Sequence, residues 1–140
     1  MTIQTATAWI LFFAGVIFVA ALVLGVVKWQ MMVTSPTGLA HPYIDTAHRS
    51  ALLYSFATGL IAAFVELSKW PSAVNLTAAG AMVLLFMGTI ANYTRLGLQG
   101  TTVNQMHNPP RSMQVVLAVL IIGELGGFLV LLTGFAAAQL

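Results

Sequence analysis

Four long runs of apolar residues follow one another along the chain, separated by shorter polar segments. They cover residues 8–29, 48–67, 73–93 and 113–138. A helix of about 20 apolar residues crosses the hydrocarbon core of a bilayer, and each run reaches that length. The pattern therefore predicts an all-α integral membrane protein, a four-helix bundle of up-down-up-down topology, in a single transmembrane domain of residues 1–140.

The connections between the runs differ in length, and the difference predicts how the helices are arranged. Only residues 68–72 join the second and third runs, with Pro71 at a position that the first turn of a helix tolerates. So short a connection makes these two helices antiparallel neighbours. The connections of residues 30–47 and 94–112 are longer and carry most of the polar side chains. In an up-down bundle they lie together on one side.

Charged residues make up only 6% of the 140 residues, against about 25% in an ordinary soluble domain. The net charge of +2 rests on five basic and three acidic side chains, too few for a nucleic-acid-binding surface. Most of the basic residues lie on the side of the long connections: Lys28, Arg49, Arg95 and Arg111. The positive-inside rule therefore predicts that the long connections are cytoplasmic and that both termini lie outside. We expect a multi-pass protein of the inner (cytoplasmic) membrane. The absence of cysteine excludes disulfides, iron–sulfur clusters and covalent haem attachment.

His48 begins the second apolar run, where a polar connection meets the membrane. An ionisable residue in such a place is by default a candidate functional residue. At about 100° per residue, its face continues through a stripe that is mostly small or polar: Leu52, Ser55, Gly59, Ala62 and Glu66. Such a stripe predicts a shallow slot for a flat macrocycle ligated by one histidine. Alternatively, the small residues let helices pack closely and His48 caps its helix.

The ionisable residues near His48 have structural as well as chemical interpretations. Asp45, one turn earlier, caps the helix or orients the second nitrogen of the imidazole. Arg49 pairs with Asp45 at i+4 or faces the lipid headgroups. Glu66, near the other end of the helix, is expected to extend to the interface or to pair with Lys69.

Three further ionisable residues stand apart from this group. His41 precedes Pro42 in an extended segment and is expected to be solvated. His107 lies in the connection QMHNPPR, as a solvated residue, a lid group or a second metal ligand. Glu124 lies near the middle of the fourth run among three glycines, where it holds helices together or handles protons.

A second polar stripe marks the end of the third run. It opens toward the same side as His48 and consists of Gly88, Ala91, Asn92, Arg95 and Gln99. Asn92 still lies in the apolar zone, so its amide needs partners: it makes an interhelical hydrogen bond or orients a substrate. Tyr54, roughly 120° from the His48 face, and Tyr93, beside Asn92, are pocket phenols or interface anchors.

Two segments of this four-run membrane chain, AHRSALLYS around His48 and GTIANY around Asn92, resemble the hydroxylaminobenzene mutase and styrene oxide isomerase superfamily. The resemblance implies a membrane-embedded isomerase. In one branch of the superfamily, ferric haem b is bound through that histidine between the subunits of a homotrimer. His48 would then be the metal ligand, and Asn92 matches an asparagine of the family's third helix. Tyr54 stands where the family pattern has asparagine, which leaves the substrate open.

With this resemblance, we assign His48, Arg49, Ser55 and Gly59 to cofactor binding. We assign the catalytic, substrate-orienting roles to three other residues: Tyr54, Asn92 and Tyr93. The expected activity is rearrangement of a small hydrophobic aromatic epoxide or arylhydroxylamine taken from the lipid bilayer. Two alternatives belong to other classes: a haem protein of electron transfer, which normally needs a second strong axial ligand, and a non-catalytic accessory membrane subunit.

Overall fold

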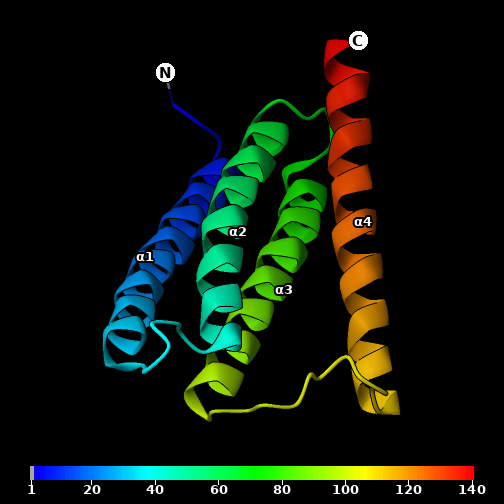
Figure 1. Cartoon of the computed structure of the whole chain (residues 1–140). Helices are drawn as coiled ribbons and strands as arrows, with labels where there is room; N and C mark the ends of the chain where they lie inside the picture. The colour runs from blue at the N-terminus through cyan, green and yellow to red at the C-terminus, as the bar shows by residue number, and fades with distance from the viewer. Residues whose placement is uncertain (1) are drawn as a thin grey trace.

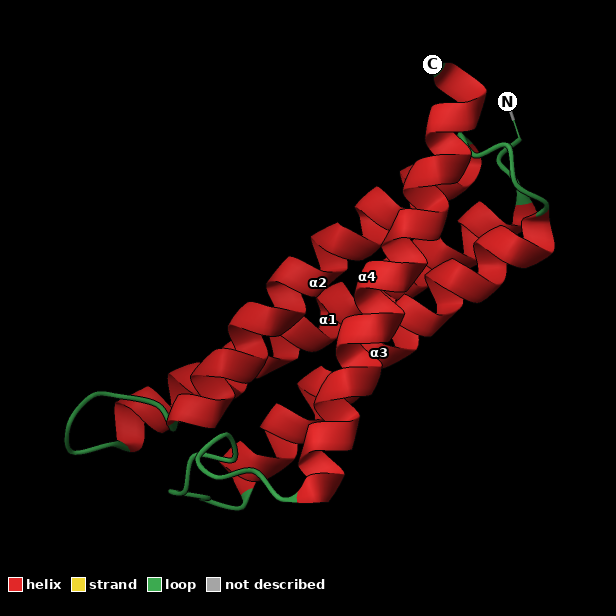
Figure 2. Ribbon diagram, turned by 90° about the vertical axis from the view of Figure 1, so that its right-hand side faces the viewer, coloured by secondary structure: helices red, strands yellow, loops and turns green. Residues whose placement is uncertain are grey.

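The computed structural model describes residues 2–140, and these residues form four helices (Figure 1). In chain order the helices are α1 (Thr5–Thr34), α2 (Pro42–Glu66), α3 (Ser72–Leu98) and α4 (Arg111–Gln139). No strand occurs among the described residues, and every connection is a loop or turn (Figure 2). The predicted all-α four-helix bundle of up-down-up-down topology is confirmed.

The bundle has two unlike ends. Both chain termini and the short connection between α2 and α3 lie at one end, the terminal end. The connections of residues 35–41 and 99–110 lie at the other (Figure 1). Polar contacts near both ends join α2 to α1: the His48 ring meets the Ala21 carbonyl, and Glu66 meets Thr7. The two helices are therefore antiparallel neighbours over most of their length.

The helices extend beyond the apolar runs, most clearly at the start of α2. Pro42 occupies the first turn, where its missing N–H has no intrahelical partner to lose. The Nδ1 atom of His41 caps the helix by accepting a hydrogen bond from the Tyr43 N–H at 3.2 Å. His41 has the extended backbone that was expected, and it is half-buried because its ring is used in the cap. Because of this cap, Asp45 and His48 lie on regular helical turns.

Three helices are long and apolar enough to cross a membrane, namely α1, α3 and α4. The chain is therefore a membrane protein. The second predicted span, α2, has 25 residues, about 37 Å of helix, but is less apolar. It contacts the other three helices, which cover much of its surface. A helix with such neighbours does not need the uniformly apolar surface that lipid requires of an exposed one.

The interior is built mainly by α1, α2 and α3. Small side chains with no exposed surface, among them Ala21, Ala47, Ala51 and Ala79, let these helices approach closely. On α4 only Leu131 and Gly134 are buried. Three hydrogen bonds near the terminal end hold α4. The Lys69 N–H donates to the Gly134 carbonyl, the Trp70 indole donates to the Val130 carbonyl, and the Gln139 side-chain amide donates to the Leu67 carbonyl.

Candidate functional site

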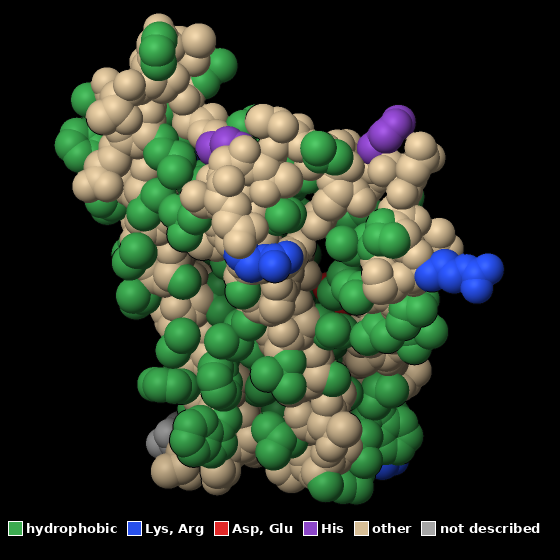
Figure 3. Space-filling model, turned by 90° about the horizontal axis from the view of Figure 1, so that it is seen from below, with side chains coloured by type: hydrophobic (Ala, Val, Ile, Leu, Met, Phe, Trp, Pro, Cys, Tyr) green, Lys and Arg blue, Asp and Glu red, His purple; other side chains and the backbone are tan. Residues whose placement is uncertain are grey.

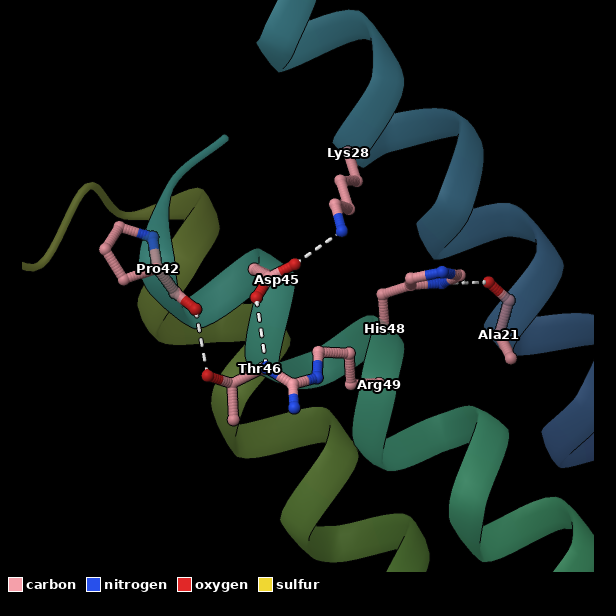
Figure 4. A network of polar contacts seen from close by, with 7 residues as sticks. All are labelled: Ala21, Lys28, Pro42, Asp45, Thr46, His48 and Arg49. Carbon is pink, nitrogen blue, oxygen red and sulfur yellow. Dashed lines mark hydrogen bonds and ion pairs between the residues drawn. The ribbon is translucent and has the colours of Figure 1, made fainter. Parts of the chain in front are cut away.

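His48 lies on the second turn of α2, and its ring crosses to α1 (Figure 4). Its Nδ1 atom is 2.9 Å from the carbonyl oxygen of Ala21. A carbonyl oxygen only accepts hydrogen bonds, so Nδ1 carries a proton and donates it. In the neutral ring, Nε2 then holds the lone pair. This is the arrangement by which proteins orient a histidine that ligates a metal.

The Nε2 atom of His48 is free to accept a ligand. It makes no hydrogen bond with residues 2–140. It is also not one of the fully buried side-chain atoms without a partner, so part of its surface is accessible. His48 also lines none of five pockets, of about 390 to 690 Å³, that lie along the described helices and connections. None of these pockets therefore offers a ligand of Nε2 an enclosed site within one chain.

Gly25 provides the space for the His48 ring on the α1 side. A Cβ atom at Gly25 would lie 3.1 Å from Cε1 of His48, closer than carbon atoms normally pack. Neither Gly25 nor the Ala21 carbonyl could be recognised in the sequence. Gly25 is one of two glycines in an apolar run, and a backbone carbonyl leaves no trace in a sequence.

Asp45 does not orient His48. Its carboxylate pairs with Lys28 of α1 at 2.5 Å and more loosely with Arg49 at 3.8 Å, so the expected Asp45–Arg49 pair is present (Figure 4). Asp45 precedes the apolar run that starts at His48, so its carboxyl lies outside the membrane-spanning part of the chain. The hydrogen bond from Lys28 is the largest influence on the Asp45 carboxyl and, against partial burial, holds its pKa below the ordinary value of 3.8.

This shift predicts an acid-dependent loss of stability. The pKa of the Asp45 carboxyl is lower in the folded chain than in the unfolded chain. Asp45 therefore contributes to the free energy of unfolding above its unfolded pKa, and this contribution is lost as the pH falls through its folded pKa. We expect the difference in melting temperature between the wild type and Asp45→Asn in detergent to be constant near neutral pH and to shrink below about pH 4. A difference that stays unchanged down to pH 3 would contradict this prediction.

The small-residue stripe of α2 packs inward and does not line an open slot. Ser55 and Ala62 are 5% and 1% exposed, and the Ser55 hydroxyl donates to the Leu52 carbonyl of its own helix at 2.7 Å. At Gly59, the one glycine of the stripe, an added Cβ would meet no neighbouring atom within 4 Å. The stripe faces α1, because contacts to α1 are made at both of its ends. Close helix packing thus explains Ser55, and space for a cofactor remains at Gly59 alone.

Glu66 closes the same interface near the terminal end. Its carboxylate accepts hydrogen bonds from the Thr7 hydroxyl at 2.5 Å and from the Gln4 backbone N–H at 3.1 Å. The predicted pair with Lys69 does not form among the described residues. Thr7 of α1 and the N-cap residue Gln4 thus satisfy the Glu66 carboxylate, and its role is structural.

Asn92 and Tyr93 line a second place, a pocket of about 450 Å³ between α3 and α4. The Asn92 amide donates to the Gln105 side-chain oxygen at 3.0 Å and accepts from Arg95 at 3.3 Å. The connection that carries Gln105 is held by Tyr43, whose hydroxyl accepts from the Gln105 N–H at 2.9 Å. Gln105 and Tyr43 could not be assigned to the site from the sequence, because their contact depends on how the connection folds back over the helices.

The remaining candidate residues lie neither beside His48 nor in the pocket between α3 and α4. Tyr54 stacks flat on Phe86 of α3, with 4.1 Å between ring centroids and 6° between ring planes. Glu124 is partly buried and forms no ion pair or hydrogen bond with the described residues. His107 is exposed in its connection. The described residues include no group of three or more His, Asp and Glu side chains that could hold a metal ion.

The candidate residues thus divide between two interfaces. His48, Gly25 and the Ala21 carbonyl lie between α1 and α2, whereas Asn92, Tyr93 and Gln105 lie between α3 and α4. The first place holds a single imidazole oriented by a backbone carbonyl, and the second offers a mostly apolar pocket with a fixed amide at its polar end. Comparison of the chain with protein-family models, curated proteins and solved structures finds no match.

Proposed function

We propose that the chain is a membrane-embedded isomerase that binds ferric haem b through His48 and rearranges a small aromatic epoxide or arylhydroxylamine. One observation carries the proposal. The Ala21 carbonyl fixes the His48 proton on Nδ1, which leaves the Nε2 lone pair for a metal. A single histidine suits haem, because the macrocycle itself would provide four nitrogen ligands of the iron and the protein needs to add only one.

The surroundings of His48 fit a flat apolar cofactor on the outer side of α1 and α2. Two turns along α2, Phe56 and its α1 neighbour Phe18 are exposed, with ring centroids 6.1 Å apart. Arg49, next to His48, is also exposed and would pair with acidic groups at the edge of the cofactor. When bound through one histidine, the haem would offer an open iron position that acts as a Lewis acid on the substrate oxygen.

The chain's own residues would collect and orient the substrate. The pocket between α3 and α4 is mostly apolar and has a volume within the range of small-molecule sites. Its Asn92 amide is fixed by Gln105 and Arg95, so it presents a preset hydrogen-bonding group to a polar substrate atom. Tyr93 lines the same pocket, and Tyr54 would contribute only from the neighbouring α2–α3 interface.

His48 and Asn92 belong to different helix interfaces of one chain, so a site that uses both would form between neighbouring copies. This division supports a homo-oligomer, which we propose to be the homotrimer implied by the superfamily resemblance. We also propose the topology that the basic residues predict, with the long connections in the cytoplasm and both termini outside the inner membrane.

The visible absorption spectrum of the purified protein in mild detergent tests this proposal. We expect a haem Soret band that shifts when styrene oxide or phenylhydroxylamine is added, with formation of the isomeric product and no added reductant. A colourless protein from haem-supplemented cells would point to an accessory subunit. A six-coordinate low-spin spectrum that ignores both compounds would point to electron transfer. Either result would overturn the isomerase proposal.

A further inference from the structure

A groove of about 690 Å³ runs between α1 and α3, on a different face of α1 from His48. Ala20 and Leu24 contribute to it from α1, and Met87 and Ala91 contribute from α3. The alanines keep it deep, and the exposed Val23 at its rim shows that it opens to the outside of the bundle. In a membrane protein such a groove faces lipid.

The polar lining of this groove is concentrated at one end. Thr94 and Arg95 lie in the last turns of α3, and Gln99 is its C-cap residue, level with the long connections. The Thr94 hydroxyl already donates to the Ile90 carbonyl at 2.8 Å. Arg95 gives one hydrogen bond to Asn92, so most of its five N–H donors remain available. The groove is thus apolar along its length and cationic at its mouth.

Arg95 has no carboxylate partner among the described residues, unlike two other cations near the long connections. Lys28 and Arg49 both pair with Asp45, whereas Arg95 and Arg111 form no ion pair among residues 2–140. Figure 3, which views this end, shows Lys and Arg as separate patches among apolar surface. Of these two arginines, only Arg95 lines one of the five pockets described above.

We propose that this groove binds one anionic phospholipid of the surrounding bilayer. One acyl chain lies along the apolar floor beside Ala20 and Ala91, and a headgroup phosphate accepts hydrogen bonds from the Arg95 guanidinium and the Gln99 amide. Guanidinium groups bind phosphate through paired hydrogen bonds, and basic pockets between membrane helices recognise anionic headgroups in this way.

The acidic residues of the chain argue against a second copy as the occupant. Such a copy would have to bring a carboxylate to Arg95, and the chain has three acidic residues. Asp45 is paired with Lys28, and Glu66 lies at the opposite end of the bundle, bonded to Thr7. Glu124 lies in the middle of α4, far from the level of the long connections. A phospholipid has its charge at the interface and its apolar part along the helices, which matches the groove.

Native mass spectrometry of the full-length protein in detergent tests this site. We expect one phosphatidylglycerol per chain to bind in preference to phosphatidylcholine. Arg95→Gln should weaken phosphatidylglycerol binding about fivefold, the effect of roughly one membrane-facing cation. The matched control Arg111→Gln removes an exposed cation of the same end and should leave binding unchanged. Ala91→Phe should fill the groove and abolish binding of both lipids, whereas Ala118→Phe on the exposed part of α4 should not.

Three results would overturn the proposal: equal binding of the two lipids, equal losses in Arg95→Gln and Arg111→Gln, or an Ala91→Phe complex with fewer chains and unchanged lipid binding. The last would identify the groove as a contact between copies. If Ala91→Phe fails to fold, the lipid preference and the arginine pair still decide. The readout is lipid mass and does not depend on haem or on isomerase activity.

Discussion

Replacement of His48 by alanine is expected to remove essentially all bound haem while the four helices remain folded. His48 offers the Nε2 atom that we propose as the protein ligand, and no other histidine lies close to it, since His41 caps α2 and His107 is exposed in the last connection. The ratio of Soret absorbance to protein absorbance measures the loss, and far-ultraviolet circular dichroism measures helix content.

Two additions make this experiment specific for ligation. His107→Ala serves as the matched control, because it removes an exposed histidine from the same end of the bundle and should keep the pigment. His48→Gly leaves a space at the α1–α2 interface beside Gly25, so added imidazole should restore part of the absorbance. Full pigment in His48→Ala would assign the iron to another ligand.

Gly97→Ala is expected to produce the largest loss of stability from a single added methyl group. Gly97 is buried, and a Cβ atom there would lie 2.6 Å from Cγ1 of Ile44 and 2.9 Å from the Ile44 backbone nitrogen. Because a backbone atom is part of the clash, α2 and α3 would have to separate. Overpacking of this kind lowers the free energy of unfolding by about 1–3 kcal/mol. The melting temperature in detergent should fall accordingly.

Gly80→Ala is the control in the same helix, and it is expected to leave stability unchanged or to raise it. An added Cβ at Gly80 meets no atom within 4 Å, so only the gain in helix propensity remains, about 0.5–1 kcal/mol. The melting temperature of this variant should equal or exceed that of the wild type. Equal melting temperatures for Gly97→Ala and Gly80→Ala would mean that α2 and α3 are not in close contact at Ile44.

The helices could be predicted from the sequence because membrane helices follow directly from the length of apolar runs. Their ends could not. The polar residues before His48 have the composition of a loop, yet Pro42 at the first turn and the His41 cap start α2 six residues earlier than the apolar run. Hydropathy does not detect caps, because the residues that make them are polar.

The site was predictable only as far as single side chains reveal it. His48 stood out by its position, but Ala21, which orients it, acts through a backbone carbonyl. Asp45 was the alternative orienting group, but its carboxylate pairs with Lys28, which lies near the C-terminal end of α1. Likewise, Glu66 found its partners in Thr7 and Gln4 and not in its sequence neighbour. Each correction involves a contact between residues distant in the chain.

The small buried surface of α4 also bears on how the protein assembles as it is synthesised. Only Leu131 and Gly134 are buried on this helix, whereas α1, α2 and α3 already enclose nearly all the other buried side chains. The first three helices can therefore associate in the bilayer before the fourth leaves the translocon. The hydrogen bonds of Lys69, Trp70 and Gln139 would then hold it in register near the short α2–α3 connection.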